Sequence, residues 1–178
     1  ADPTPVATKG LAPTPVPSSF AFKCVSSFSA ALVIPFGVTY VPDSAYMDCR
    51  HITSIEFPST LVRIEANAFK GSTLNTVDFS MATNLTTIGD EAFFDTSLTS
   101  VDFPDSLATV GHSAFSDCGS LDSISFGHTV SVSIGNDVFR NTALGSSSPD
   151  VYVAAGTDLS LFPDGLDVYH WGSWPPCG

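Results

Sequence analysis

The sequence predicts a right-handed solenoid of the α/β type, built from about six stacked coils. One observation is a six-residue pattern with apolar residues at positions one, four and six, as in LTSVDF at 98–103 and LDSISF at 121–126. The other is the segment between these copies, LATVGHSAF, which recurs upstream as LTTIGDEAF and LVRIEANAF. A unit this short cannot bury its apolar face alone, so we expect successive units to stack into one continuous core.

Each six-residue copy is expected to form a short strand with one buried face, because its apolar and polar residues alternate. The last apolar residues of successive copies are 23, 22, 24, 23 and 27 positions apart. Each strand follows one coil after the previous one and runs in the same direction, which predicts a single parallel sheet on the concave side of the array. The residues that mark the period are Ile34, Phe57, Phe79, Phe103, Phe126 and Val153.

The return half of each coil repeats as well. Segments such as ANAF at 66–69 and HSAF at 112–115 suit a short helical turn with its aromatic side chain pointing inward. Gly89, Gly111 and Gly135 precede three of these segments and are expected to provide tight backbone turns. Stacked from coil to coil, the Phe side chains would form a ladder, and packing of this kind is the structural explanation for the 14 Phe of the chain.

Composition limits the kinds of partner. The chain has 18 acidic and six basic residues and a net charge of −12, which argues against nucleic acid and anionic membrane surfaces. No apolar run approaches the roughly 18 residues of a membrane-spanning helix, so membrane insertion is not expected. The excess of acidic over basic residues favours basic partners, cations or neutral glycans. The even number of cysteines and the sequon Asn84-Leu85-Thr86 favour a secreted or cell-surface protein, with Asn84 as the glycosylation site.

The chain is expected to divide into four segments. Residues 1–19 contain five prolines with Thr, Ser, Ala and Val, a composition typical of a flexible linker or stalk. Residues 20–37 are predicted to form an N-terminal cap with the first strand, 38–149 the repeat coils, and 150–178 the last strand and a C-terminal cap.

The pattern LxxVxFPxxLxxIGxxAFxxCxxL resembles the BspA-like, or Treponema-type, leucine-rich repeat, and the closing segment VYVAAGTDLSLFPDGLDVYHWGSW is similar to the end of such arrays. The resemblance covers about residues 29–174 and implies a leucine-rich-repeat fold. It also implies a secreted or surface protein of bacteria or protists that acts in adhesion or in recognition of host or matrix proteins. The chain departs from the pattern at Val41-Pro42, where the family has Ile-Gly, and in insertions at 80–84 and 144–150.

The cysteines are expected to fasten the ends of the array. Cys49 and Cys118 occupy the same repeat position three coils apart, which puts roughly 14 Å between them, too far for a disulfide. Proximity then favours the bridges Cys24–Cys49 and Cys118–Cys177, one at each cap. The alternative is that Cys49 and Cys118 are free buried thiols. No CxxC or His-pair pattern indicates a metal site.

Positions three and five of each strand project from the sheet face opposite the core. This open face would carry a column of small hydroxyls beside a column of three carboxylates. Acids at strand spacing are expected to raise the pKa of their neighbours. The predicted binding residues are Ser54, Glu56, Thr76, Asp78, Ser100, Asp102, Ser123 and Tyr152.

We expect a binding or adhesion module that uses this face for an extracellular protein or glycan of basic character, with weak Ca²⁺ binding as an open alternative. A second hypothesis is a structural surface or coat component that self-associates. A remote third is a polysaccharide-acting β-solenoid enzyme with Asp78, Asp102 and Asp105 as acid and base. No catalytic motif occurs and the four histidines fall at unrelated coil positions, so neither catalytic residues nor a cofactor is expected.

Overall fold

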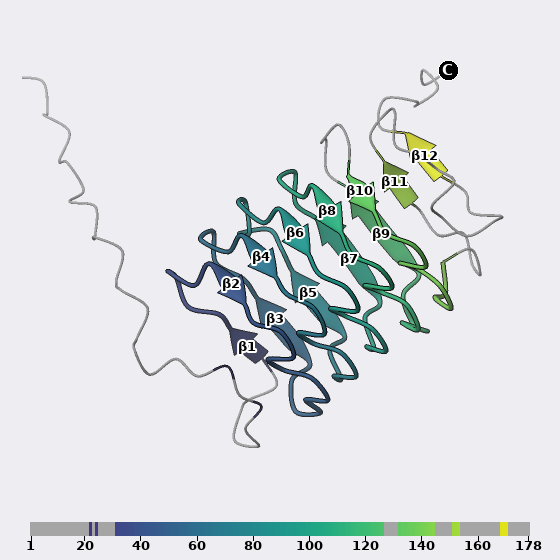
Figure 1. Cartoon of the computed structure of the whole chain (residues 1–178). Helices are drawn as coiled ribbons and strands as arrows, with labels where there is room; N and C mark the ends of the chain where they lie inside the picture. Colours follow the sequence, from purple (N-terminus) through teal and green to yellow (C-terminus); the bar gives the residue numbers. More distant parts are fainter. Residues whose placement is uncertain are drawn as a thin grey trace, which may run out of the picture.

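The computed structural model describes residues 22, 24, 31–126, 132–144, 151–153 and 168–170. Within these residues the chain forms a stack of short strands in sequence order and no helix (Figure 1). The strands are β1 (Ala31–Val33), β2 (Tyr40–Val41), β3 (Ser54–Glu56), β4 (Arg63–Ile64), β5 (Thr76–Asp78), β6 (Thr87–Ile88), β7 (Ser100–Phe103), β8 (Thr109–Val110), β9 (Ser123–Phe126), β10 (Ser133–Ile134), β11 (Val151–Val153) and β12 (Val168–His170).

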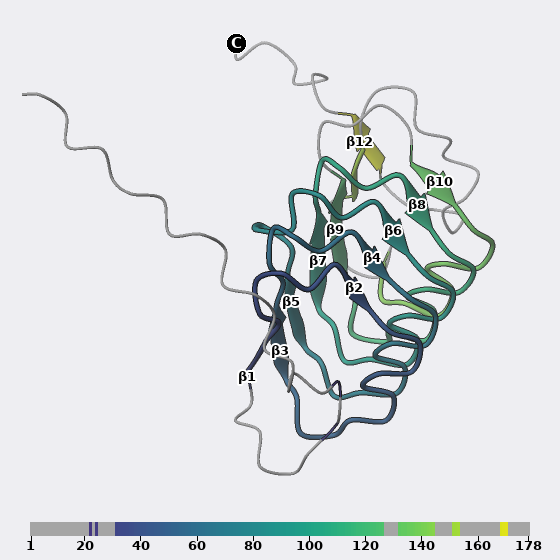
Figure 2. The same ribbon diagram turned by 60° about the vertical axis from the view of Figure 1, so that its left-hand side comes forward.

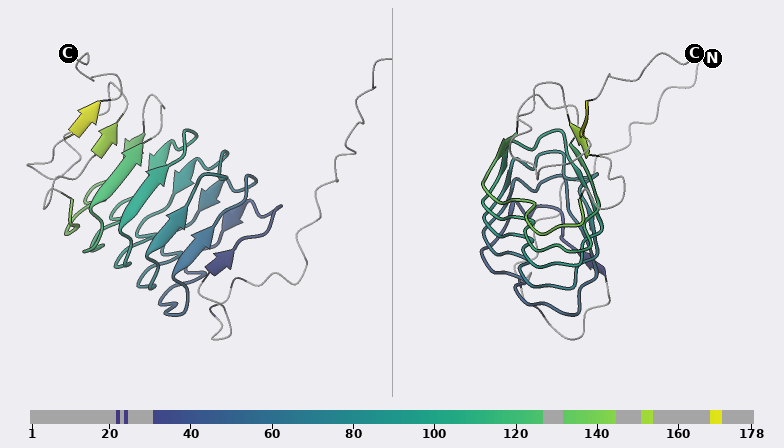
Figure 3. Two further views of the ribbon diagram at one scale, coloured as in Figure 1. Left: turned by 180° about the vertical axis from the view of Figure 1, so that it is seen from behind. Right: turned by 90° about the vertical axis from the view of Figure 1, so that its right-hand side faces the viewer.

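The strands line two sides of the solenoid (Figure 2). Strands β1, β3, β5, β7, β9 and β11 make one side, which we call the odd-strand face, with β12 added beyond β11. Strands β2, β4, β6, β8 and β10 form a second, five-stranded parallel sheet. Seen along the stack, the coils superpose as closed outlines around a common interior (Figure 3). The parallel solenoid is therefore confirmed, and the prediction of a single sheet is wrong.

The register on the odd-strand face is the one that the repeat alignment predicts. Ser54 pairs with Thr76 and Glu56 with Asp78, while Ser100 pairs with Ser123 further along. The alternation is confirmed in the same strands, because Ile55 and Val101 are each 1% exposed whereas their polar neighbours face solvent. The strands of the second sheet alternate in the same way. Each buries one Ile or Val, and the residue before it is exposed, as in Arg63–Ile64, or half-buried, as Thr87 is.

The predicted helical turns are absent from the described residues, and backbone geometry explains why. Asn67, Glu91 and Ser113 have left-handed φ angles of 55°, 52° and 51° at equivalent positions of successive coils. A helix does not tolerate a left-handed residue in each turn. The main-chain N–H groups here donate to the following coil instead, as Phe69 N does to Ala92 O (2.8 Å) and Phe93 N to Ala114 O (2.8 Å). The return leg is thus a row of turns hydrogen-bonded from coil to coil.

The three glycines before these turns have a different role from the one predicted. None of Gly89, Gly111 and Gly135 has a positive φ, so none is there for a left-handed turn. A Cβ atom on Gly111 would lie 2.5 Å from the backbone nitrogen of Asp90 in the preceding coil, and one on Gly89 would lie 2.7 Å from that of Ala66. Glycine is required here because two backbones pass too closely for a side chain.

The predicted aromatic ladder is confirmed, and it is double. Tyr46, Phe69, Phe93 and Phe115 stack with ring centroids 5.3, 5.1 and 5.1 Å apart beneath the return legs. A second ladder lies beneath the odd-strand face, and the two meet edge to face, as where Phe103 contacts Phe115 at 5.4 Å. All four rings of the first ladder are at most 1% exposed. Stacked and T-shaped contacts of this kind stabilise the interior beyond the burial of apolar area.

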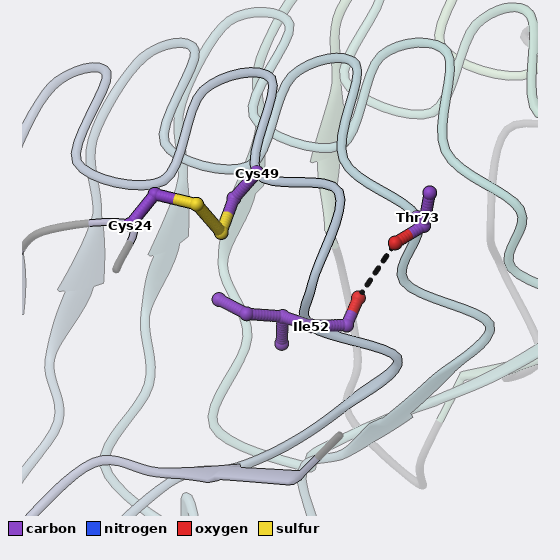
Figure 4. Close-up of a disulfide and its surroundings, with 4 residues drawn as sticks. All are labelled: Cys24, Cys49, Ile52 and Thr73. Atoms are coloured by element: carbon purple, nitrogen blue, oxygen red, sulfur yellow. Dashed lines mark hydrogen bonds between the residues drawn. A yellow bond between two sulfur atoms is a disulfide. The ribbon is translucent and has the colours of Figure 1, made fainter. Parts of the chain in front are cut away.

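The two predicted disulfides have different outcomes. Cys24 and Cys49 form a bridge with their Cα atoms 5.5 Å apart, which confirms the N-terminal pairing (Figure 4). In the same view the Thr73 hydroxyl donates to Ile52 O in the preceding coil (3.1 Å). Cys118 is a free thiol and fully buried, so the predicted Cys118–Cys177 bridge is wrong, and Cys177 lies outside the described residues.

Cys118 and Cys49 occupy the same repeat position, and the surroundings of Cys118 show why it is a free thiol whereas Cys49 forms a disulfide. Its sulfur lies 3.1 Å from the Thr96 hydroxyl and 3.1 Å from Phe93 O, both in the preceding coil. The thiol therefore points into the interior of the stack, where it occupies the place that Thr96 takes one coil earlier. Burial raises the pKa of the Cys118 thiol, which keeps it protonated and unreactive.

We predict that Gly111→Ala destabilises the protein by about 1–3 kcal/mol, because the new methyl group overpacks the backbone of the neighbouring coil. The measurement is the free energy of unfolding in urea. Gly119→Ala is the matched control, since nothing lies within 4 Å of a Cβ there. Equal stability of the two variants would contradict the close-approach role of Gly111.

Thiol mapping tests the cysteine assignments. Alkylation in denaturant without reductant should label Cys118, whereas Cys24 and Cys49 should be labelled only after reduction. In the native protein Cys118 should resist the reagent, because it is buried and its thiolate is disfavoured. Recovery of Cys118 in a disulfide-linked peptide would show that the assignment is wrong.

Candidate functional site

The odd-strand face carries the predicted column of acids. Glu56 lies beside Asp78 in adjacent strands, and Asp102 lies beside Ser125 further along. The side chains of Glu56, Asp78 and Asp102 are all exposed. The sequence pattern therefore identifies which side chains share this face, and the structure places all three carboxylates on it.

The hydroxyl column runs alongside the acids. Thr76 and Ser100 are exposed, while Ser54 and Ser123 are half-buried. Tyr152 pairs with Ser125 through β11, so it continues the acid column in register, and its side chain lies outside the described part of the chain.

The odd-strand face is divided between β5 and β7. Strands β1, β3 and β5 form one hydrogen-bonded sheet and β7, β9, β11 and β12 another, and no strand pairing joins β5 to β7 although both are fully described. The two coils are still hydrogen-bonded to each other just before these strands begin, where Thr99 N donates to Asn75 O (3.3 Å). The separation therefore opens along the strands, toward the ends that carry Asp78 and Asp102.

The interior widens at the same place. The ring centroids of Phe79 and Phe103 lie 6.4 Å apart, compared with 5.2 Å for Phe57 and Phe79 in the coil before and 4.5 Å for Phe103 and Phe126 in the coil after. Val77 of β5 is only partly buried, whereas the equivalent Val101 is 1% exposed. The widening is thus a feature of both the sheet and the core beneath it.

An inserted segment causes this separation. The coil from Phe79 to Phe103 has 24 residues, two more than the 22 between Phe57 and Phe79. The extra length lies at residues 80–84, where Met81 is exposed and Ala82 is buried. Because the main chain of the return legs keeps its coil-to-coil hydrogen bonds, the additional residues are accommodated on the odd-strand side.

The separation forms a depression of about 610 Å³, which we call the acidic depression. It contains three carboxylates and three hydroxyls above an apolar floor, a composition that suits a cationic or hydrogen-bonding group. The residues that line it are Val77, Asp78, Phe79, Ser80, Thr83, Asp102, Phe103, Pro104, Asp105 and Ser106.

The electrostatics of Asp78 differ from the prediction. Hydrogen bonds from the Ser80 side chain and backbone N–H hold the pKa of Asp78 below its ordinary value, the backbone contact measuring 2.8 Å. The expectation that stacked acids raise this pKa is therefore wrong for Asp78, because the Ser80 donors lower it by more than desolvation raises it. Asp78 stays ionised well into the acidic range.

Positive charge is absent from the odd-numbered strands. Two basic side chains pair with acids elsewhere, Arg63 with Glu65 (3.1 Å) and Lys70 with Glu91, both on the even-strand side or the turns. In the described residues, neither Glu56 nor Asp102 forms an ion pair. The column is thus an uncompensated negative surface.

The remaining predictions concern glycosylation, metal binding and membrane insertion. The Asn84 side chain is exposed, and its amide nitrogen donates to Ser59 O (2.7 Å), so glycosylation there stays a prediction. The described residues contain no group of three His, Cys, Asp or Glu side chains placed to hold a metal ion, and weak Ca²⁺ binding likewise stays a prediction. No helix in the part of the chain that the structure describes has the length and apolarity to cross a membrane.

We predict that Ser80→Ala raises the pKa of Asp78 toward its ordinary value, because it removes the hydroxyl that stabilises the carboxylate. The measurement is an NMR titration of the Asp78 carboxyl carbon in both proteins. Ser97→Ala, an exposed serine away from this face, serves as the control. An unchanged Asp78 pKa in Ser80→Ala would show that the side-chain hydrogen bond does not hold the charge.

Comparison with solved structures finds the same architecture in bacterial proteins. A leucine-rich repeat protein of T. pallidum, TpLRR, superposes with a TM-score of 0.61 and 28% identity, covering 70% of this chain and 58% of that one. The pneumococcal vaccine antigen PcpA superposes with a TM-score of 0.51 and 26% identity, covering 68% of this chain and 40% of that one. The chain therefore spans about 58% or less of the length of these two structures.

Sequence comparison agrees with the structural one. No curated protein sequence matches the chain significantly. The model of the BspA-type leucine-rich repeat region matches residues 18–147 with six copies. The repeat period, the parallel register and the stacked aromatic core all follow this pattern, and the chain belongs to the BspA-type leucine-rich repeat family.

Proposed function

We propose that this chain is a cell-surface binding module whose odd-strand face binds a basic segment of another protein. The observation that carries the proposal is the column of Glu56, Asp78 and Asp102, exposed on strands that contain no Lys or Arg. An uncompensated row of carboxylates attracts a cationic partner at long range and orients it on arrival.

The extracellular location is supported by independent observations. The Cys24–Cys49 bridge is of a kind that persists in oxidising environments and is rare where thiols are kept reduced. One of the structural neighbours is described as a vaccine antigen, which fits a protein displayed to the outside. Both arguments favour secretion or surface display of this chain.

The acidic depression also brings together Asp78, Asp102 and Asp105, the residues of the remote enzyme hypothesis. A glycosidase of the usual kind needs one carboxyl group with a raised pKa to act as the acid. The pKa of Asp78 is lowered, which favours a permanent negative charge and therefore electrostatic recognition. We accordingly propose binding and not hydrolysis at this site.

The test compares two variants of equal net charge. One carries Glu56→Gln, Asp78→Asn and Asp102→Asn on the odd-strand face. The other carries Asp48→Asn, Asp95→Asn and Asp137→Asn on the turns, where Asn also tolerates the left-handed φ of 53–56°. Both variants and the wild type are measured against immobilised arrays of short basic, neutral and acidic peptides.

We expect the wild type to retain basic peptides, the odd-strand variant to lose at least about tenfold in affinity, and the turn variant to keep nearly all of it. Retention should fall with added salt, because the attraction is electrostatic. An equal loss in both variants would mean that net charge alone is responsible. Equal binding of acidic and basic peptides by the wild type would also contradict the proposal.

A further inference from the structure

A second depression adjoins the acidic one on the odd-strand face. It has a volume of about 280 Å³, and its lining includes the apolar side chains of Val33, Phe36 and Met81 together with Glu56 and Asp78. We call it the apolar depression. Asp78 lines both depressions, so the two are neighbours that meet at this side chain.

Its apolar side chains are unusually exposed. Met81 is 64% exposed, Val33 59% and Phe36 44%. The core of the same coils is well packed, since Ile34 and Phe57 are only 2% and 3% exposed. Poor packing of the core therefore does not explain why these three side chains are exposed. Large apolar side chains that gather on a surface and are bordered by polar groups are typical of a binding site for another molecule.

Two departures from the repeat pattern produce this patch of exposed apolar side chains. Val33 stands at the position that holds Glu56 and Asp78 in the next two strands, so the acid column begins with an apolar residue. Met81 belongs to the insertion at 80–84 that separates β5 from β7. The same insertion therefore opens the acidic depression and supplies one wall of the apolar one.

The distance between the two depressions determines how far apart the two side chains of a bound peptide must be. Strands lie about 4.8 Å apart, so the space between β5 and β7 lies roughly 7–12 Å from the side chains on β1 and β3. An extended peptide advances about 3.3 Å per residue, and this distance therefore corresponds to two to four residues.

We propose that these two depressions together bind one extended segment of a partner protein, with an apolar side chain in the apolar depression and Lys or Arg two to four residues away in the acidic depression. The inference rests on the proposed function and adds the apolar requirement and the spacing. The cationic group is held by Asp78 and Asp102, and the apolar group is buried against Met81 and Phe36.

The experiment uses a synthetic heptapeptide with one Phe and with Lys two and four residues after it, titrated into the full chain by fluorescence anisotropy. Three control peptides replace Phe by Ser, replace both Lys by Gln, or reverse the order of the residues. The protein variants are Met81→Ser with Phe36→Ser for the apolar arm and Asp78→Asn with Asp102→Asn for the acidic arm. Tyr40→Ser with Met47→Ser, exposed residues outside both depressions, is the matched control for the apolar arm.

We expect the apolar-arm variant to weaken binding of the Phe peptide about tenfold and to leave binding of the Ser peptide unchanged. The acidic-arm variant should weaken binding of the Lys peptides by a similar factor and should not affect the Gln peptide. The control variant should match the wild type. All the substituted side chains are exposed, so circular dichroism should show the fold intact in every variant.

The outcomes separate a failure of this inference from a failure of the proposed function. If the Phe and Ser peptides bind equally well while Lys is still required, the two-part segment is wrong and the proposed function stands. If Lys is not required, both fail. If sedimentation shows a dimer that Met81→Ser with Phe36→Ser abolishes, the apolar depression is covered by a second copy of this chain and the inference is overturned.

Discussion

Main-chain hydrogen bonds between successive coils are the constraint on which the rest of this structure depends. They run along the odd-strand face, along the even-strand sheet and along the turns, where Asp95 N donates to Ser116 O (3.0 Å) as Phe93 N does to Ala114 O. Each coil is thereby held to the next on both strand faces and along the turns, except between β5 and β7, where no strand pairing is formed. The aromatic ladders, the glycines at the close approaches and the columns on the surface all follow from this one spacing.

A stack held in this way has little freedom to absorb extra residues. The aromatic ladder beneath the return legs repeats without interruption, as Phe69, Phe93 and Phe115 show by their equal separations. The longer coil between Phe79 and Phe103 cannot displace that ladder, so its additional length separates β5 from β7 instead. The candidate site is thus the place where the repeat is irregular, and the regular coils on both sides hold its residues in position.

Much of this could be predicted from the sequence because the repeat is explicit. Alternation within the six-residue pattern identifies Ile55 as buried and Glu56 as exposed, and alignment of the copies gives the strand register. The N-terminal disulfide follows from the same alignment. These features depend on local pattern and on neighbouring coils, both of which the sequence shows directly.

Other features depend on contacts that no local pattern shows. ANAF and HSAF are compatible with a helical turn in isolation, and only the hydrogen bonds to the next coil impose left-handed residues such as Asn67. Two-residue strands such as β6 are too short to give a periodic signal. Cys118 occupies the same repeat position as Cys49, and only the packing around its sulfur distinguishes them. The exposure of Phe36 and Met81 depends on tertiary packing, although the sequence alone locates the insertion at 80–84 that contains Met81.

Amide hydrogen exchange tests most directly whether a regular stack of coils is interrupted by a local opening between β5 and β7. Residue-resolved exchange should show strong protection throughout β3 and β9 and, within β5 or β7, amides that exchange much faster because they have no partner across the separation. Uniform protection across β3, β5, β7 and β9 would mean that the sheet is continuous, and would contradict the origin of the site in the longer coil between Phe79 and Phe103.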